Sequence, residues 1–186
     1  MRARSHNLGQ YRGATRGFTL IEAVVTIVLI GVIAMAVIPV ISSGIKTYIT
    51  TTTSINTLSK LRFATERMAR EIREVRRNIG TPSNYDFVTM GANSVVFYKS
   101  DGYRVSITSG VPNATLTYLS PGGVTTSATL TDQINATTDL SFTYYDMTGA
   151  ATASLSQVAF VQVDLKLTED GAPLRQVTRL GLRNQQ

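Results

Sequence analysis

A single acidic side chain at the start of a membrane-length apolar run constrains this chain more than any other feature. Glu22 is followed by the run Ala23–Ile41, 19 residues interrupted only by Thr26, Gly31 and Pro39. At a helical rise of 1.5 Å per residue, the run is about long enough for the roughly 30 Å hydrocarbon layer of a bilayer. A carboxylate beside it costs on the order of 2.5–3.5 kcal/mol on insertion scales, so it needs a partner or a function. The pattern predicts a membrane-spanning helix over residues 18–41 with a functional acid.

The residues before this run form a basic leader. Residues 1–17 hold four arginines and no acid, and such positive charge stays on the cytoplasmic side of a membrane. An ordinary secretory signal would carry its cleavage site after the apolar stretch, where residues 42–46 are a poor match. We therefore expect the cut to fall before the apolar run.

A resemblance to a known family lies in residues 16–22, which read RGFTLIE. This junction resembles the processing signature of type IV pilins and type II secretion pseudopilins, in which the prepilin peptidase cuts after the glycine and methylates the new amino-terminal phenylalanine. The resemblance implies cleavage between Gly17 and Phe18, N-methylation of Phe18, and Glu22 as the fifth mature residue. The alternative is a signal anchor that contains a glutamate by accident.

Composition excludes most catalytic chemistry. The chain has no cysteine, and its only histidine, His6, lies in the leader. A processed chain therefore has neither a thiol nor an imidazole for nucleophilic catalysis or for the usual zinc sites. The pair Glu169-Asp170 could join a calcium site, but an acidic pair before Gly171 is more typical of a solvated hairpin turn. We expect no metal, no cofactor and no enzyme activity.

A second helical segment is expected over residues 42–80. Its apolar side chains recur at spacings of 3 and 4 and predict one stripe lying against a globular head: Leu58, Leu61, Thr65, Met68, Ile72, Val75 and Ile79. Gly80–Pro82 supply a stop. Pro39 is expected to break the helix, because it lacks an N–H and its ring clashes with the carbonyl of Met35. Thr50–Ser54 is either helix or a short linker.

Residues 81–186 have the character of an antiparallel β head, with short runs rich in Val, Thr, Tyr and Phe between turn residues. The expected strands are Tyr85–Met90, Ser94–Lys99, Tyr103–Thr108, Thr115–Leu119, Val124–Leu130, Leu140–Tyr145, Gln157–Thr168 and Leu174–Arg183. The predicted fold class is α+β, with a long amino-terminal helix packed on an antiparallel β-sheet head. The pilin resemblance implies the same architecture.

Two further segments resemble minor pilins. Residues 61–73 resemble the stem, and residues 178–184 the last strand, of J-type minor pseudopilins and of related proteins of mannose-sensitive haemagglutinin and twitching pili. Pro39 departs from this pattern, because a proline at this place is typical of major fibre pilins. The absence of a carboxy-terminal cysteine pair departs from many fibre pilins instead.

The resemblance implies a structural subunit that initiates or caps a type IV pilus or a type II secretion pseudopilus; a major fibre pilin is the alternative. Its expected partners are the prepilin peptidase, other pilin or pseudopilin subunits, the inner-membrane assembly platform and, before assembly, membrane lipid. Once the leader is removed, the amine of Phe18 can be neutralised by Glu22 of a neighbouring subunit. Gly31 and Pro39 mark where the helix can loosen on leaving lipid. We expect a single-pass inner-membrane protein with its head in the periplasm or outside.

Two rival classes of protein are compatible with a membrane-anchored chain of this kind. A DNA-binding competence pilin would set the arginines of the second helical segment against phosphates: Arg62, Arg67, Arg70, Arg73, Arg76 and Arg77. These share the segment with three glutamates and lack interleaved exposed aromatics, and the formal charge of +6 falls to about +2 without the four leader arginines. Nucleic acid is therefore not an expected partner. A membrane-anchored enzyme would need a catalytic cluster, and the sequence offers none.

Overall fold

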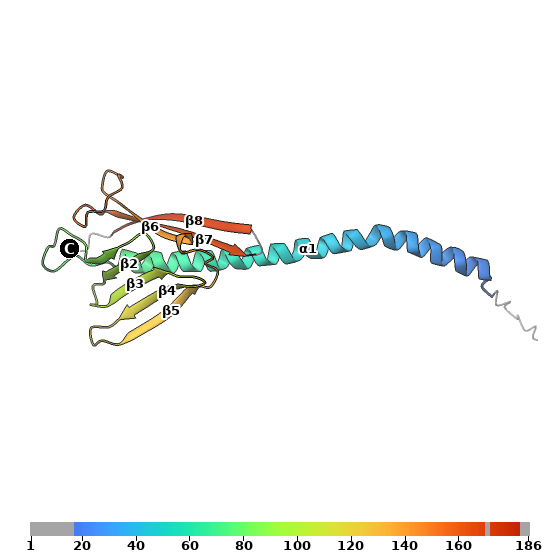
Figure 1. Ribbon diagram of the computed structural model, residues 1–186, viewed down its shortest axis with the longest axis horizontal. Helices are drawn as coiled ribbons and strands as arrows, with labels where there is room; N and C mark the ends of the chain where they lie inside the picture. The colour runs from blue at the N-terminus through green and yellow to red at the C-terminus, as the bar shows by residue number, and fades with distance from the viewer. Residues whose placement is uncertain (1–16, 170–171, 183–186) are drawn as a thin grey trace, which may run out of the picture. The chain divides into compact units, whose positions relative to one another are not determined.

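The computed structural model describes residues 17–169 and 172–182, and these fold as an α+β protein (Figure 1). The helix α1 spans Leu20–Arg73, and the 3-10 helix η1 spans Thr137–Asp139. The strands are β1 (Phe87–Met90), β2 (Ser94–Tyr98), β3 (Arg104–Ser109), β4 (Ala114–Leu119), β5 (Thr125–Thr131), β6 (Leu140–Tyr145), β7 (Phe160–Glu169) and β8 (Ala172–Gly181). Each of the eight strands expected from the sequence is present, with ends within three residues of the predicted ones.

The chain divides into two compact units, residues 1–47 and 48–186. In the first unit the described residues from Leu20 onward are all helical, and the helix runs through Gly31 and Pro39 without interruption. The predicted break at Pro39 is therefore wrong for the chain as it stands. Proline removes one N–H donor and crowds the preceding turn, but a helix absorbs this by bending while its other hydrogen bonds persist. Thr50–Ser54 is helical as well.

The helix ends at Arg73, well before the predicted stop at Gly80–Pro82. Val75 and Arg77 instead form antiparallel bridges with Lys99 and Tyr85. Val75 is buried although it lies beyond the helix, so the predicted apolar stripe continues into extended chain after α1. Its two outermost members are exposed, with Leu58 at 37% and Ile79 at 79% accessibility, whereas the four central members, from Leu61 to Ile72, are buried.

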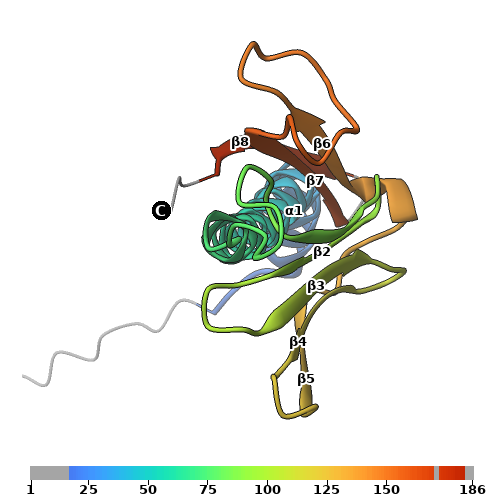
Figure 2. The same cartoon turned by 90° about the vertical axis from the view of Figure 1, so that its left-hand side faces the viewer.

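The β head is antiparallel, as expected, and its strands form two sheets, a division that the sequence did not predict. Five strands follow the order β1-β2-β3-β4-β5, and three follow the order β6-β7-β8. Figure 2 shows the end of α1 lying between them, with the three-stranded sheet on one side and the five-stranded sheet on the other. The sheets meet where the amide of Phe142 donates to the carbonyl of Ala92 (2.7 Å) and the hydroxyl of Tyr144 donates to the carbonyl of Gly91 (3.1 Å).

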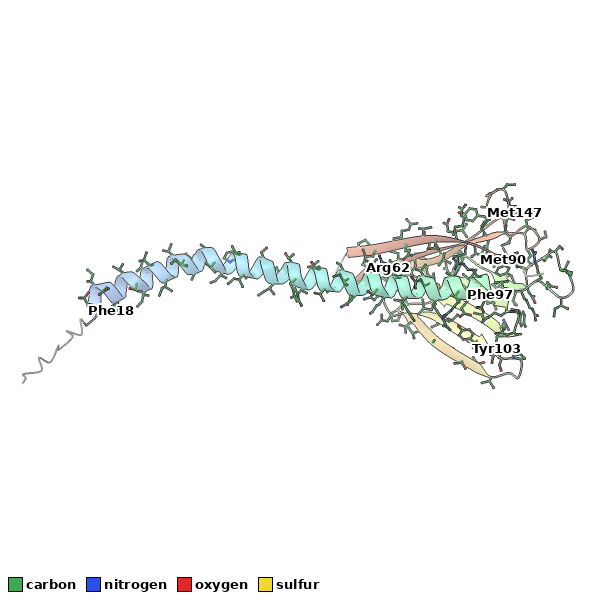
Figure 3. All side chains as sticks on the ribbon, turned by 180° about the vertical axis from the view of Figure 1, so that it is seen from behind. Phe18, Arg62, Met90, Phe97, Tyr103 and Met147 are labelled. Atoms are coloured by element: carbon green, nitrogen blue, oxygen red, sulfur yellow. The ribbon has the colours of Figure 1, made fainter. Side chains whose placement is uncertain are left out.

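One hydrophobic core fills the space between α1 and both sheets. On β7, Val161, Val163, Leu165 and Leu167 are buried and alternate with Gln162, Asp164 and Lys166, as the period-2 pattern predicted. The aromatic ring of Phe87 packs edge-on against Phe97 of the same sheet and Tyr144 of the other, with centroids 6.1 Å apart in both pairs. Such edge-to-face pairs add about 0.5–1.5 kcal/mol beyond area burial, so this trio joins the two sheets. In Figure 3, Phe97 lies within the head.

Polar contacts fasten α1 to the head as well. The guanidinium of Arg67 donates to the hydroxyl of Tyr118 (2.6 Å), and the hydroxyl of Thr57 donates to the carboxylate of Glu169 (2.5 Å). Burial raises the pKa of Tyr118, an effect strengthened by Glu71 and opposed by Arg67. The phenol is therefore neutral at physiological pH and both donates and accepts hydrogen bonds.

Candidate functional site

The start of α1 is built by a capping residue. Residues 17–19 are not helical, and the first helical residue is Leu20. The amide of Glu22 donates to the side-chain oxygen of Thr19 (3.3 Å), and the amide of Ala23 donates to the backbone carbonyl of Thr19 (3.2 Å). Thr19 is thus the N-cap, and Glu22 occupies the third helical position. A negative charge is stabilised there by the helix macrodipole.

Thr19 is not among the site residues predicted from the sequence. The signal was present, because a threonine followed three residues later by a glutamate is the pattern of a capping box. The pattern was hidden because the same residues also belong to the processing junction.

The first unit leaves its apolar side chains uncovered. Phe18 is 80% exposed, and every large apolar side chain from Leu20 to Ile41 is exposed as well. Figure 3 shows Phe18 at the beginning of the helix and the side chains that follow projecting from it. Among the described residues, α1 is the one helix that is long and apolar enough to cross a membrane. Contiguous apolar surface of this extent indicates a membrane or an assembly interface.

Glu22 lies at the beginning of this apolar surface. The hydroxyl of Thr26 donates to the backbone carbonyl of Glu22 (2.7 Å) and does not involve the carboxylate. Within the described residues no cation forms an ion pair with the Glu22 carboxylate; the eight ion pairs found there all belong to the second unit. The site predicted from the sequence, Gly17, Phe18 and Glu22, therefore consists of neighbours along one chain, and Glu22 has no ion-pair partner among the described residues.

Gly31 and Pro39, the predicted loosening points, both lie inside continuous helix. A side chain at Gly31 would meet nothing within 4 Å. Gly31 is therefore not required by packing within the described chain.

Glu169, part of the predicted calcium candidate, forms hydrogen bonds within the head instead. The Glu169 carboxylate accepts hydrogen bonds from the hydroxyl of Thr57 and from the side-chain amide of Gln133, and these hold its pKa below the usual range. Asp170 and Gly171 lie outside the described residues, as do the leader residues 1–16 and residues 183–186. The described residues contain no group of three or more side chains arranged to hold a metal ion.

Half of the arginines considered for phosphate binding are engaged within the head. The Arg76 guanidinium forms an ion pair with Asp86 (2.7 Å) and lies 4.9 Å from the ring centre of Tyr98. That of Arg77 lies 4.1 Å from the ring centre of Tyr85, and Arg67 binds Tyr118 as described. Tyr98 and Tyr118 lie on β2 and β4, so sequence order gave no sign of their pairing with Arg76 and Arg67.

A scan against known families places one match on this chain. Residues 12–38 match the prokaryotic N-terminal methylation motif. The match covers the processing junction, Glu22 and most of the apolar run. No curated protein matches the chain. The chain thus carries the prokaryotic N-terminal methylation motif, the amino-terminal signature of type IV pilins and pseudopilins.

Proposed function

We propose that this protein is a minor pilin or pseudopilin that initiates or caps a filament after prepilin peptidase has removed residues 1–17. The observation that carries the proposal is the uncovered apolar surface of α1 beyond Phe18, with one carboxylate at its beginning and no ion-pair partner for it among the described residues. In this proposal the surface is covered first by inner-membrane lipid and then by the helices of other subunits. The head stands in the periplasm or outside.

The proposed assembly step pairs two charges. Removal of the leader converts the backbone amide of Phe18 into a cationic amine, which the peptidase then methylates without removing its charge. In an apolar filament interior an unpaired charge is costly, so the amine of one subunit and the Glu22 carboxylate of its neighbour stabilise each other. This pairing sets the register of the two helices, and the assembly platform would bring the subunits together.

The choice of a minor subunit depends on the resemblance of residues 61–73 and 178–184 to minor pilins. Residues 183 and 184 of the second segment lie outside the described residues. A major fibre pilin remains the alternative, and the two differ in abundance: a major subunit forms most of the filament mass. A DNA-binding role is less well supported, because Arg67, Arg76 and Arg77 already have partners within the head.

Processing is the direct test. Gly17→Val should block cleavage, because the peptidase of this family needs a small residue before the cut. Mass spectrometry of the membrane protein should then show a chain heavier than the wild type by the 17-residue leader. Gly31→Val is the matched control, since position 31 has open space around it and lies away from the junction. A wild-type chain that keeps its leader, or is cut after Ile41, would refute the proposal.

A further inference from the structure

Within the described head, the two sheets have four edge strands, and three of them are protected. β1 is four residues long and bulged between Phe87 and Thr89. On β6, the amide of Phe142 donates to Ala92 and the carbonyl of Tyr144 accepts from Thr152. Short length, bulges and cover by neighbouring chain are the usual ways in which a sheet edge is closed to foreign strands.

β8 is protected by its side chains. The amide of Leu182 donates to the carbonyl of Ala159, so these two residues form a hydrogen-bonded pair. Hydrogen-bonded and non-hydrogen-bonded pairs then alternate along the ladder between β7 and β8. The residues whose backbone groups point away from β7 are then Pro173, Arg175, Val177 and Arg179. One lacks an N–H and two are charged, and both features discourage the addition of another strand.

β5 has none of these protective features. Its seven residues read TTSATLT, with no charge, proline or glycine, and Thr125–Thr129 are exposed. The amide of Ser120 donates to the carbonyl of Val124, which fixes the alternation of the β4–β5 ladder. Thr125, Ser127 and Thr129 therefore direct their N–H and C=O groups away from β4. Within the described residues no other backbone group reaches them.

A hollow adjoins this edge on the side facing α1. It has a volume of about 410 Å³ and is lined by Ser59, Lys60 and Phe63 of the helix and by residues 129–132 at the end of β5. The ring of Phe63 is 63% exposed there, unlike the neighbouring Leu61 and Ala64, which are buried. Leu116 and Tyr118 of β4 pair with Ala128 and Thr126, and Tyr118 reaches Arg67 of α1, so Ala128 and Thr126 face the helix side too.

We propose that the β5 edge receives an extended, uncharged segment from the head of the next subunit in the filament, which adds a sixth strand to the five-stranded sheet. The open N–H and C=O groups of Thr125, Ser127 and Thr129 require a main chain as partner, and the uncharged side chains of β5 favour an uncharged one. Every second side chain of the added strand would point to the side of Phe63, where an apolar group can be buried.

The inference depends on the proposed function, because that function supplies the neighbour. Subunits of a filament all point the same way, so the contact is heterologous, and β5 does not pair with its own copy about a two-fold axis.

Ser127→Pro tests the edge directly, because it deletes one outward N–H while leaving the β4 ladder intact. Ser127→Ala is the matched control: both variants lose the hydroxyl contact between Ser127 and Thr117 (2.9 Å), but only the proline loses the donor. Relative to the alanine variant, the proline variant should be depleted in sheared filaments about fivefold or more, since a hydrogen bond and the strand geometry are both lost. The processed membrane pool and thermal melting of the detergent-solubilised chain serve as controls.

Thr125→Lys provides a second variant in case Ser127→Pro melts early. It places a charge at the open edge, as β8 does naturally, and should also deplete the filament pool, whereas Val177→Lys on β8 should not. Wild-type incorporation of Thr125→Lys, or equal incorporation of Ser127→Pro and Ser127→Ala, would overturn the inference. The inference would also be overturned if the solubilised wild-type chain formed a dimer that Ser127→Pro abolishes, because the β5 edge would then pair with a second copy of the same chain. Failure of the proposed function itself is distinguishable, because then even the wild type is absent from filaments.

Discussion

The ammonium of Lys99 lies 3.3 Å from the carboxylate of Glu71 and so joins the end of β2 to the last turns of α1. The Glu71 side chain is only 5% exposed, and its other neighbouring cation is Arg67 at 3.4 Å. Lys99 also contacts Glu74 at 2.7 Å. Burial by itself lowers the pKa of Lys99. The hydrogen bond to Glu74 and the charge of Glu71 raise this pKa by more than burial lowers it, so the net shift is upward. Lys99 remains charged at physiological pH.

Lys99→Met should therefore destabilise the head by about 3 kcal/mol, because it leaves a buried carboxylate with only one of its cations. Lys60→Met is the matched control: its ion pair with Asp132 is exposed, at 43% and 61% of the two side chains, and should contribute at most about 1 kcal/mol. Denaturant unfolding of both variants gives the comparison. Equal losses would show that burial of Glu71 does not govern this contact.

Met68→Asp and Ile72→Asp should each unfold or strongly destabilise the head. Both side chains are fully buried between α1 and the sheets, and an unpaired charge there costs several kcal/mol unless the side chain escapes to water. Ile79→Asp is the contrasting control, since Ile79 belongs to the same sequence stripe but is exposed. Thermal melting should separate the first two variants from the third, and unchanged melting of all three would refute the burial of the stripe.

That contrast shows what the sequence could and could not predict. The strands were predictable because β-branched runs and turn residues are local signals. The end of α1 was not, because Val75 leaves the helix to pair with Lys99, which lies beyond β1 and β2 in the sequence. The division into two sheets was missed for the same reason.

For the candidate site, too, local patterns can be seen in the sequence and long-range contacts cannot. Gly17, Phe18 and Glu22 belong to one short motif that is visible in the sequence, and they lie within the matched residues 12–38. The contacts of Arg67, Arg76 and Arg77 with tyrosines of the head, and the open edge at β5, could not be predicted, because each depends on which segments become neighbours.

Asp139 should contribute to the acid sensitivity of the head. Burial alone raises the pKa of this carboxyl, but Lys166 at 2.9 Å and the amides of Ala136 and Asn135 lower it more, so the net shift is downward. A carboxyl whose folded pKa is lowered stabilises the fold above its unfolded pKa of about 4 and loses this contribution as the pH falls through the folded value. Asp139→Asn should lower stability at neutral pH and flatten its dependence on pH below about 4.

Denaturant unfolding between neutral and acidic pH measures this effect. Asp132→Asn should change the profile less, because Lys60 lowers the pKa of this carboxyl as well but solvent screens the exposed pair. A profile that is as steep in Asp139→Asn as in the wild type would contradict the assignment.

Glu22→Gln should separate assembly from folding. The substitution keeps the size of the side chain but removes the charge that is proposed to pair with the Phe18 amine, so processing and melting of the head should be unchanged while the amount in sheared filaments falls. Immunoblots of the filament and membrane pools give the ratio. If Glu22→Gln enters filaments at the wild-type level while remaining processed, the charge-pairing mechanism is wrong.

The cap at Thr19 has a consequence for the precursor. Because α1 starts at Leu20 and its first turn is closed by Thr19, the peptide bond between Gly17 and Phe18 lies in non-helical backbone. A peptidase that cuts this bond meets non-helical backbone and does not have to unwind any helix first. The cap and the helix would then persist through maturation, and cleavage changes only the charge and length of the segment before them.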